Sequence, residues 1–159
     1  MASTLTVDNI VGATSASNIH IPGHCVAIYH HTRDPGTQST VSTTLVETGL
    51  TITLTPKSVN NKFLLWASMQ ECYVGASQKA IGIAFAKNGS RLYDTDSATL
   101  GYTAAGGANY INVNLHAMDT PATISSITYS VMVKSVYGDS VGWHGDNTPA
   151  FFTVMEIAQ

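Results

Sequence analysis

Histidines are the first candidates for chemistry in this sequence, because six of them occur among few other ionisable groups. His20 and His24 lie four residues apart, and imidazole nitrogens at short spacing can bind a metal ion. A Pro-Gly pair lies between them, however, and it interrupts a strand so that the two side chains point in unrelated directions. His30 and His31 are neighbours, which places them on opposite faces of a regular strand. We therefore expect no metal and no cofactor, with His20 and His24 as the residual metal candidates.

Nucleophilic and acid–base catalysis lack a recognisable motif. The sequence contains no Gly-x-Ser-x-Gly elbow and no glycine-rich phosphate loop. Cys25 follows His24 directly, and neighbours on a strand face opposite ways, so the two side chains do not share a hydrogen bond. Asp94 and Asp96 could face calcium from one side of an extended segment, but no calcium-loop spacing follows. Three distant carboxylates could still converge for glycoside cleavage: Glu47, Glu71 and Asp119. We expect a protein that is not an enzyme.

The segment 137–147 has the composition of a binding loop, with aromatic and polar side chains among glycines. Aromatic rings can stack on a sugar while neighbouring polar groups bond its hydroxyls, and a tryptophan can anchor a protein partner. The alternative is a long loop whose Trp143 folds back onto the body of the protein. The candidate contacts with a glycan or a partner are Tyr137, Trp143, His144, Asp146 and Asn147.

Strands must position these residues, because alternation of apolar and polar residues dominates the chain. The Asn-Gly pair at residues 88–89 favours a tight hairpin turn, and other turn signals recur every 8–20 residues. We predict an all-β protein, an eight-stranded jelly-roll β-sandwich preceded by a short extended N-terminal arm. The strand-like segments are residues 25–31, 51–55, 62–74, 80–86, 110–115, 127–133 and 151–157.

Composition excludes several classes of partner. Charged residues make up 11% of the chain, against about 25% in a typical soluble domain. The net charge is -3 and no basic stripe is present, so we expect no nucleic-acid binding. No apolar run approaches the roughly 20 residues of a membrane span. The N-terminal residues lack the pattern of a signal peptide, so we expect synthesis in a cytoplasm. Cys25 and Cys72 are predicted to be buried free thiols rather than a disulfide.

The N-terminal region differs from the rest. Residues 3–10 alternate, residues 12–17 are small, and residues 19–23 lead into the body. We divide the chain into a docking arm and linker at 1–24 and a jelly-roll domain at 25–159. A lone arm strand leaves backbone donors unpaired and therefore needs a partner surface. The arm residues expected to contact it are Leu5, Val7, Ile10, Ile19 and Ile21.

Several segments resemble virion proteins of marine and cyanobacterial phages, including tail-fibre proteins. They are LTVDNI at 5–10, IHIPGH at 19–24, TLTPKSVNNKFLL at 53–65, IAFAKNGS at 83–90 and TVMEIA at 153–158. The third is similar to an "ITPKSASSKILV"-type stretch in that group. Together the matches cover most of the chain in a consistent order. The chain departs from the tail fibres of the group in having a short arm in place of a long stem.

This resemblance implies a homotrimer whose jelly roll is similar in shape to tumour-necrosis-factor-like domains. It implies a location on the virion surface, as a short fibre, a knob or a capsid decoration protein attached to other capsid or tail proteins. The rival function is a knob that binds a host receptor or glycan. Aromatic residues exceed what one thin sandwich must bury, so each of the following belongs either to the trimer interface or to the core: Trp66, Tyr73, Tyr110, Tyr129, Phe151 and Phe152.

Overall fold

The alternating segments form strands in the structure, a computed structural model that describes residues 21–34, 36–75, 79–93, 99–102, 109–143 and 148–159. Within these ranges all regular elements are strands, and no helix is long and apolar enough to span a membrane. The strands are β1 (Cys25–Arg33), β2 (Gln38–Thr40), β3 (Val46–Leu54), β4 (Lys62–Val74), β5 (Ala80–Lys87), β6 (Ser90–Arg91), β7 (Thr99–Tyr102), β8 (Asn109–Asp119), β9 (Ile127–Ser135), β10 (Val141–Trp143) and β11 (Ala150–Ile157).

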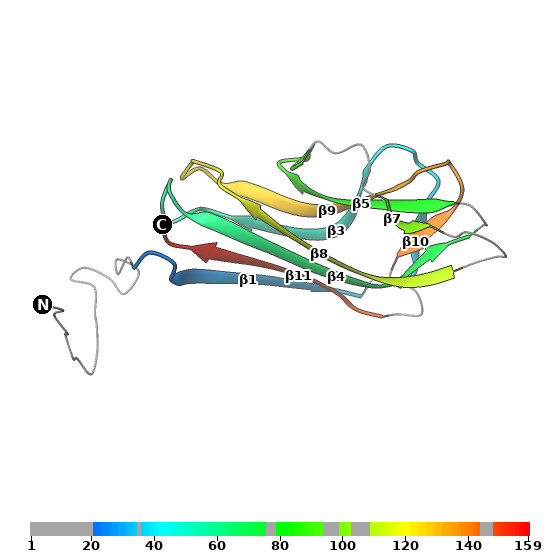
Figure 1. The fold of residues 1–159 in the computed structure, drawn as a ribbon, viewed down its shortest axis with the longest axis horizontal. Coiled ribbons are helices and arrows are strands. Elements are labelled where there is room, and N and C mark those ends of the chain that lie inside the picture. Colours follow the sequence, from blue (N-terminus) through cyan, green and yellow to red (C-terminus); the bar gives the residue numbers. More distant parts are fainter. Residues whose placement is uncertain (1–20, 35, 76–78, 94–98, 103–108, 144–147) are drawn as a thin grey trace, which may run out of the picture.

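Two antiparallel sheets lie face to face (Figure 1). We call the first sheet the β4 sheet, and its order is β1-β11-β4-β8. The short strand β10 pairs with the last residues of β4, and β2 pairs with β10. In the second, the β9 sheet, the order is β3-β9-β5, with β6 and β7 beyond β5. The long connections β3–β4, β4–β5, β8–β9 and β9–β11 each pass from one sheet to the other, which is the jelly-roll pattern.

The predicted all-β sandwich is confirmed, with three short strands added. Eight strands have four or more residues, and β2, β6 and β10 are two or three residues long. The sequence analysis did not identify β7, because its four residues contain a glycine and do not alternate. The Asn-Gly turn forms as expected: Asn88 and Gly89 have φ of 51° and 76° and join β5 to β6.

The core fills the space between the sheets. Phe63, Leu65 and Ala67 of β4 point inward and are completely buried, as are Val131 and Val133 of β9. Aromatic pairs cross the core, with ring centroids 6.0 Å apart for Phe63 and Tyr129 and 5.7 Å apart for Phe85 and Phe152. These contacts join the two layers because each pair takes one ring from each sheet.

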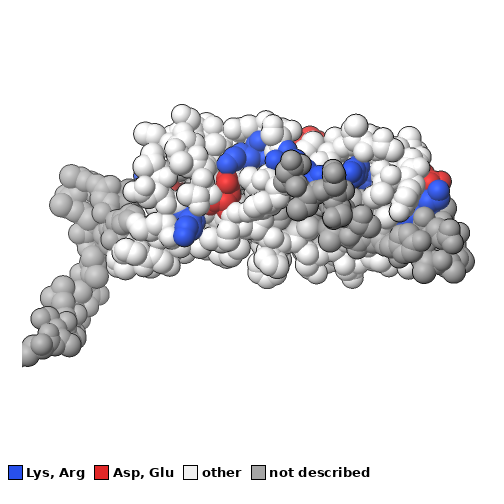
Figure 2. All heavy atoms as spheres, turned by 45° about the horizontal axis from the view of Figure 1, so that its top comes forward, with Lys and Arg blue, Asp and Glu red and all other residues white. Residues whose placement is uncertain are grey.

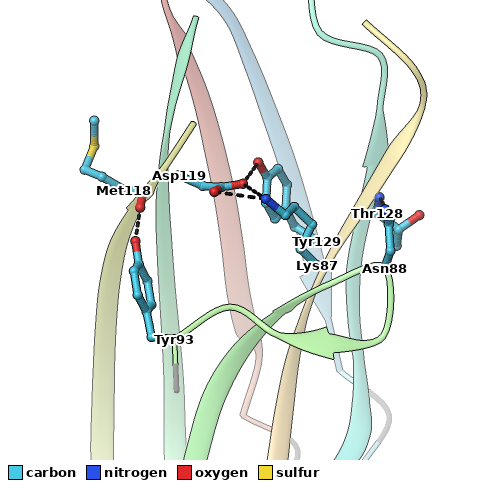
Figure 3. Close-up of polar contacts among 7 residues, drawn as sticks. All are labelled: Lys87, Asn88, Tyr93, Met118, Asp119, Thr128 and Tyr129. Atoms are coloured by element: carbon cyan, nitrogen blue, oxygen red, sulfur yellow. Dashed lines mark hydrogen bonds and ion pairs between the residues drawn. The ribbon is translucent and has the colours of Figure 1, made fainter. Parts of the chain in front are cut away.

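A carboxylate at the end of β8 ties the sheets together near the β5–β6 turn (Figure 3). Asp119 accepts bonds from Lys87 Nζ of β5 at 2.9 and 3.1 Å, and its Oδ2 accepts the Tyr129 hydroxyl of β9 at 2.7 Å. Burial, and then this bond to Asp119, raises the pKa of Tyr129 far above its usual value, so the hydroxyl stays a donor. Beside it, Tyr93 donates to the carbonyl of Met118, while Asn88 and Thr128 exchange bonds of 2.8 and 2.9 Å.

A second carboxylate, which is fully buried, fixes the loop before β4. Glu156 of β11 is fully buried, and its Oε1 accepts the Lys57 backbone N–H at 2.6 Å and Asn61 Nδ2 at 2.8 Å. Burial and the charge of Glu156 raise the pKa of Tyr29. The loop that connects β3 to β4 is thus held by β11, which is the last strand of the chain.

Replacing Asp119 by Ala should lower the free energy of unfolding by about 2–4 kcal/mol, because Lys87 and Tyr129 lose their shared acceptor. Tyr129→Phe, which removes one bond only, should cost about 1 kcal/mol. Denaturant melts of both variants test this expectation. Equal stability of Asp119→Ala and the wild type would contradict it.

Candidate functional site

The two outer faces of the sandwich differ in chemistry. The outer face of the β9 sheet carries polar pairs: the Thr53 and Thr128 hydroxyls lie 2.8 Å apart in an exposed position, and the hydroxyl of the buried Ser130 lies 2.9 Å from Glu47 Oε1. Figure 2 shows charged side chains gathered in a band on this side of the molecule, above a mostly uncharged surface. The outer face of the β4 sheet is the candidate functional surface, because large apolar side chains face solvent there and its central rows contain no charged residue.

The strand register builds this surface in rows. Each row takes one residue from β1, β11, β4 and β8, and we call these twelve residues the apolar face. The rows are Ile28, Met155, Leu64 and Met118; His30, Thr153, Trp66 and His116; and Thr32, Phe151, Ser68 and Asn114. None of the twelve is Asp, Glu, Lys or Arg. Ile28 is 63% exposed, Trp66 55% and Met118 44%, so large apolar side chains here face solvent.

A hollow of about 210 Å³ lies at the middle of the apolar face, lined by Trp66, Ser68, Phe151 and Thr153. His30 lies next to one of the lining residues, with its ring stacked on that of Phe151 at a centroid distance of 6.1 Å. Its Nδ1 lies 2.9 Å from Thr153 Oγ1 and its Nε2 lies 3.0 Å from Thr32 Oγ1. Hydroxyls donate or accept, so both neutral tautomers of His30 are accommodated.

The sequence analysis assigned six aromatic residues to either the trimer interface or the core, and the structure divides them between the outer surface and the core. Trp66 and Phe151 belong to the apolar face, and Tyr73 and Tyr110 continue the outer surface of the same sheet with ring centroids 5.3 Å apart. Tyr110 is 61% exposed. The remaining two, Tyr129 and Phe152, are completely buried in the core.

Several residues of the apolar face were not identified from the sequence, namely Ile28, Leu64, His116, Met118 and Met155, and His30 was considered only as a metal ligand. One signal was available in β4. In its first half apolar residues occupy both faces of the strand: Phe63 and Leu65 point inward, and Leu64 and Trp66 point outward. A strand of this kind is typical of a sheet that is covered on both faces.

The loop proposed for glycan contact is only partly described. His144, Asp146 and Asn147 lie outside the described residues. Tyr137 is 56% exposed, and the Lys79 ammonium lies 5.6 Å from its ring centroid while pairing with Asp139 at 2.8 Å. Trp143 is 5% exposed and belongs to the core cluster, so its ring is not free to stack on a sugar.

The arm is also mostly outside the described residues, and its division from the body stays a prediction. Leu5, Val7, Ile10, Ile19 and His20 are not described. Ile21 and His24 are exposed, and β1 begins at Cys25. The entry to β1 is anchored at the C-terminus: the Gly23 N–H donates to the Ala158 carbonyl at 2.7 Å, and Ala158 N–H donates to the His24 carbonyl at 2.9 Å.

Other candidates for chemistry stay apart. Asp94 and Asp96 lie outside the described residues. Of the carboxylates considered for glycoside cleavage, Asp119 is occupied by Lys87 and Tyr129, and Glu47 bonds Ser130 on the opposite sheet. Glu71 has a φ of 50° at the irregularity in β4. In the described part of the chain, no three His, Cys, Asp or Glu side chains group together as metal ligands.

The cysteines differ in exposure. Both are free thiols, and Cys72 is completely buried as predicted. The prediction that Cys25 is buried was wrong, because it begins β1 at the end of the sheet and is exposed. Burial raises the pKa of the Cys72 thiol to about 12.

Comparisons with known proteins include a weak structural likeness to a viral protein. No protein-family model matches the chain, and no curated protein sequence matches it. A solved structure described as "Structure of infectious bursal disease virus Gt strain" aligns with 100% of this chain and 43% of its own chain, at 15% identity and a TM-score of 0.36. The chain therefore spans less than half the length of that neighbour.

Thiol labelling should distinguish the cysteines. At pH 8 one thiol per chain, Cys25, should react rapidly, and Cys72 should react only after unfolding because its pKa of about 12 keeps it protonated and burial blocks the reagent. Mass spectrometry of alkylated protein gives the readout. Rapid labelling of a folded Cys25→Ser variant would contradict this.

Trp143→Ala should lower the free energy of unfolding by about 3–5 kcal/mol, because it opens a cavity in the core. Tyr137→Ala, at an exposed position of the same region, should cost about 1 kcal/mol or less. Thermal and denaturant melts measure both. A stable Trp143→Ala variant would be inconsistent with a buried ring.

Proposed function

We propose that this protein is a non-enzymatic structural component of a phage particle surface, a short trimeric knob or capsid decoration protein. The jelly-roll body assembles with copies of itself, and residues 1–24 attach it to other capsid or tail proteins. The observation that carries this proposal is the apolar face on one side of the sandwich, where Ile28, Trp66 and Met118 are exposed and Leu64 is partly exposed between them.

Exposed apolar area of this extent indicates assembly. Single exposed apolar residues are ordinary, whereas contiguous patches mark surfaces that bind other molecules. Here four strands contribute neighbouring apolar residues, and Trp66 and Phe151 border a hollow between them. The low charge of the chain supports the same conclusion, because charge is depleted at the centres of protein interfaces.

The particle to which the body attaches is inferred from the segments that resemble phage virion proteins. The arm sequence LTVDNI alternates like a strand, and a strand without a sheet needs a partner that pairs its backbone. An arm of this kind would add its backbone to a capsid or tail protein. This leaves the body outside the particle, on the virion surface.

A glycan-binding knob is the alternative function. Tyr137 supports it as an exposed aromatic side chain beside a lysine and an aspartate. The buried position of Trp143 removes the main stacking platform from this alternative. The structural role is therefore our conclusion.

Deleting residues 2–18 should leave a folded oligomer that no longer joins particles, because the deletion removes the docking strand and spares β1–β11. Particles grown without the native protein are incubated with full-length or truncated protein, purified and analysed by mass spectrometry. Equal recovery of the two proteins on particles would overturn the docking role. Tyr137→Ala serves as a matched control and should bind particles like the wild type.

A further inference from the structure

We infer that Asn88 is a site of spontaneous covalent modification, at which its side-chain amide is converted to a carboxylate through a cyclic imide. The reaction takes place in the two-residue turn between β5 and β6 and needs no reactant other than water. Asn88 is the one asparagine of the chain that precedes a glycine. The modification is independent of the proposed assembly and of the docking arm.

The conversion has two steps. In the first, the backbone nitrogen of Gly89 attacks the side-chain carbonyl carbon of Asn88, and a new N–C bond closes a five-membered ring. The bond from that carbon to Nδ2 breaks, and the departing group takes up the Gly89 amide proton and leaves as ammonia. In the second step, water opens the ring at either of its two carbonyl carbons. The products are aspartate and isoaspartate, and in the latter the backbone runs through the former side chain.

The attacking nitrogen is open to approach. A side chain on the residue after an asparagine crowds that nitrogen, and glycine has none. Asn88, Gly89 and Ser90 are all exposed, and a Cβ placed on Gly89 would have nothing within 4 Å. The turn residues lie between the paired Lys87 and Ser90, so the Gly89 N–H is outside the β5–β6 ladder. Within the described part of the chain, no group accepts a hydrogen bond from it.

The attacked carbonyl is held and polarised by β9. Asn88 Oδ1 accepts the Thr128 N–H at 2.9 Å, and the Asn88 N–H donates to the Thr128 carbonyl at 2.8 Å. Figure 3 shows these two residues side by side at the turn. A backbone N–H directed at a carbonyl oxygen stabilises the negative charge that develops there when a nucleophile adds to the carbon. The exposed side chain also leaves a path for ammonia to reach solvent.

Other asparagines in the described ranges lack this combination. Asn61 is 1% exposed, and its Nδ2 donates to Glu156 Oε1. Asn60 is followed by Asn61, whose N–H is bonded to the Ser58 carbonyl at 3.3 Å. Three more lie in the extended strand β8 and precede tyrosine, valine or leucine: Asn109, Asn112 and Asn114. The fold therefore selects Asn88 among them.

The two products affect the turn differently. Asn88 and Gly89 have φ of 51° and 76°, and aspartate is among the residues that adopt such angles. An aspartate at position 88 can also accept the Thr128 N–H as asparagine does. Isoaspartate adds one carbon to the backbone of a two-residue turn, so Lys87 and Ser90 lose their register. Because Lys87 also bonds Asp119, isoaspartate disturbs the link between the two sheets.

Ageing of the full-length protein tests the site. Samples are kept at 37 °C at pH 6 and pH 9, digested briefly with chymotrypsin and analysed by mass spectrometry. The peptide that contains residues 88–89 should gain about 1 Da before any peptide with another described asparagine. Its rate should rise at least about 10-fold from pH 6 to pH 9, because the deprotonated backbone nitrogen is the nucleophile. Synthetic standards separate aspartate from isoaspartate by retention time.

Asn88→Gln is the test variant, since a glutamine would have to close a six-membered ring. The mass gain at this turn should slow at least about 10-fold, and circular dichroism shows whether the fold is kept. Asn60→Gln is the matched control, at another exposed asparagine, and the peptide with residues 88–89 should react in it as in the wild type.

Melting temperatures test the difference between the products. Asn88→Asp carries the aspartate product alone, and its melting temperature should stay within about 2 °C of the wild type. The fraction of aged protein that contains isoaspartate should melt at least about 3 °C lower than the wild type.

No mass gain at Asn88 at pH 9 would overturn the inference, and a synthetic peptide of residues 84–93 that reacts would then show that the turn protects this bond. An earlier gain at another described asparagine would overturn the choice of site. Equal melting temperatures of the isoaspartate fraction and the wild type would overturn the effect on the link between the sheets.

Discussion

The thirteen-residue strand β4 is the constraint on which the rest of the structure depends, because its first half carries apolar residues on both faces. The inward residues Phe63, Leu65 and Ala67 are completely buried against the β9 sheet. The outward residues Leu64 and Trp66 are flanked by β11 and β8, which contribute Met155 and Met118 to the same row as Leu64. One sheet therefore supplies both half of the core and the surface that we propose for assembly, and a change in the register of β4 would disturb the two together.

Two carboxylates, the partly buried Asp119 and the fully buried Glu156, fix the ends of this arrangement. Asp119 joins β8 to β5 and β9, and thereby links the two sheets at the β5–β6 turn (Figure 3). Glu156 holds the loop that leads from β3 into β4 through Lys57 and Asn61. Both carboxylates bond elements that adjoin connections between the layers, and two partners each offset part of the cost of removing these groups from water. Their surroundings indicate a structural role, since the bonds connect elements that are distant in sequence.

Much of the fold could be predicted because a strand is a local pattern. Alternation located seven of the long strands, and the Asn-Gly pair located the hairpin turn at residues 88–89. Local patterns failed where the decisive contact is distant. Cys25 and Cys72 lie in similar apolar sequences, yet one begins an exposed strand end and the other is in the core. Trp143 lies among glycines like a loop residue, but β10 pairs with β4 and β2 and carries its ring inward.

The sequence by itself determined that the chain is all-β and that it forms a sandwich. These properties depend on composition and on the alternation of apolar and polar residues, which is a pattern among residues that are close in sequence. Only the tertiary structure decided which apolar residues share an outer face. Ile28, Leu64, Met118 and Met155 are far apart in the chain and form one row because of the order β1-β11-β4-β8 and its register. Strand order is set by packing across the whole sandwich, and no local spacing encodes it.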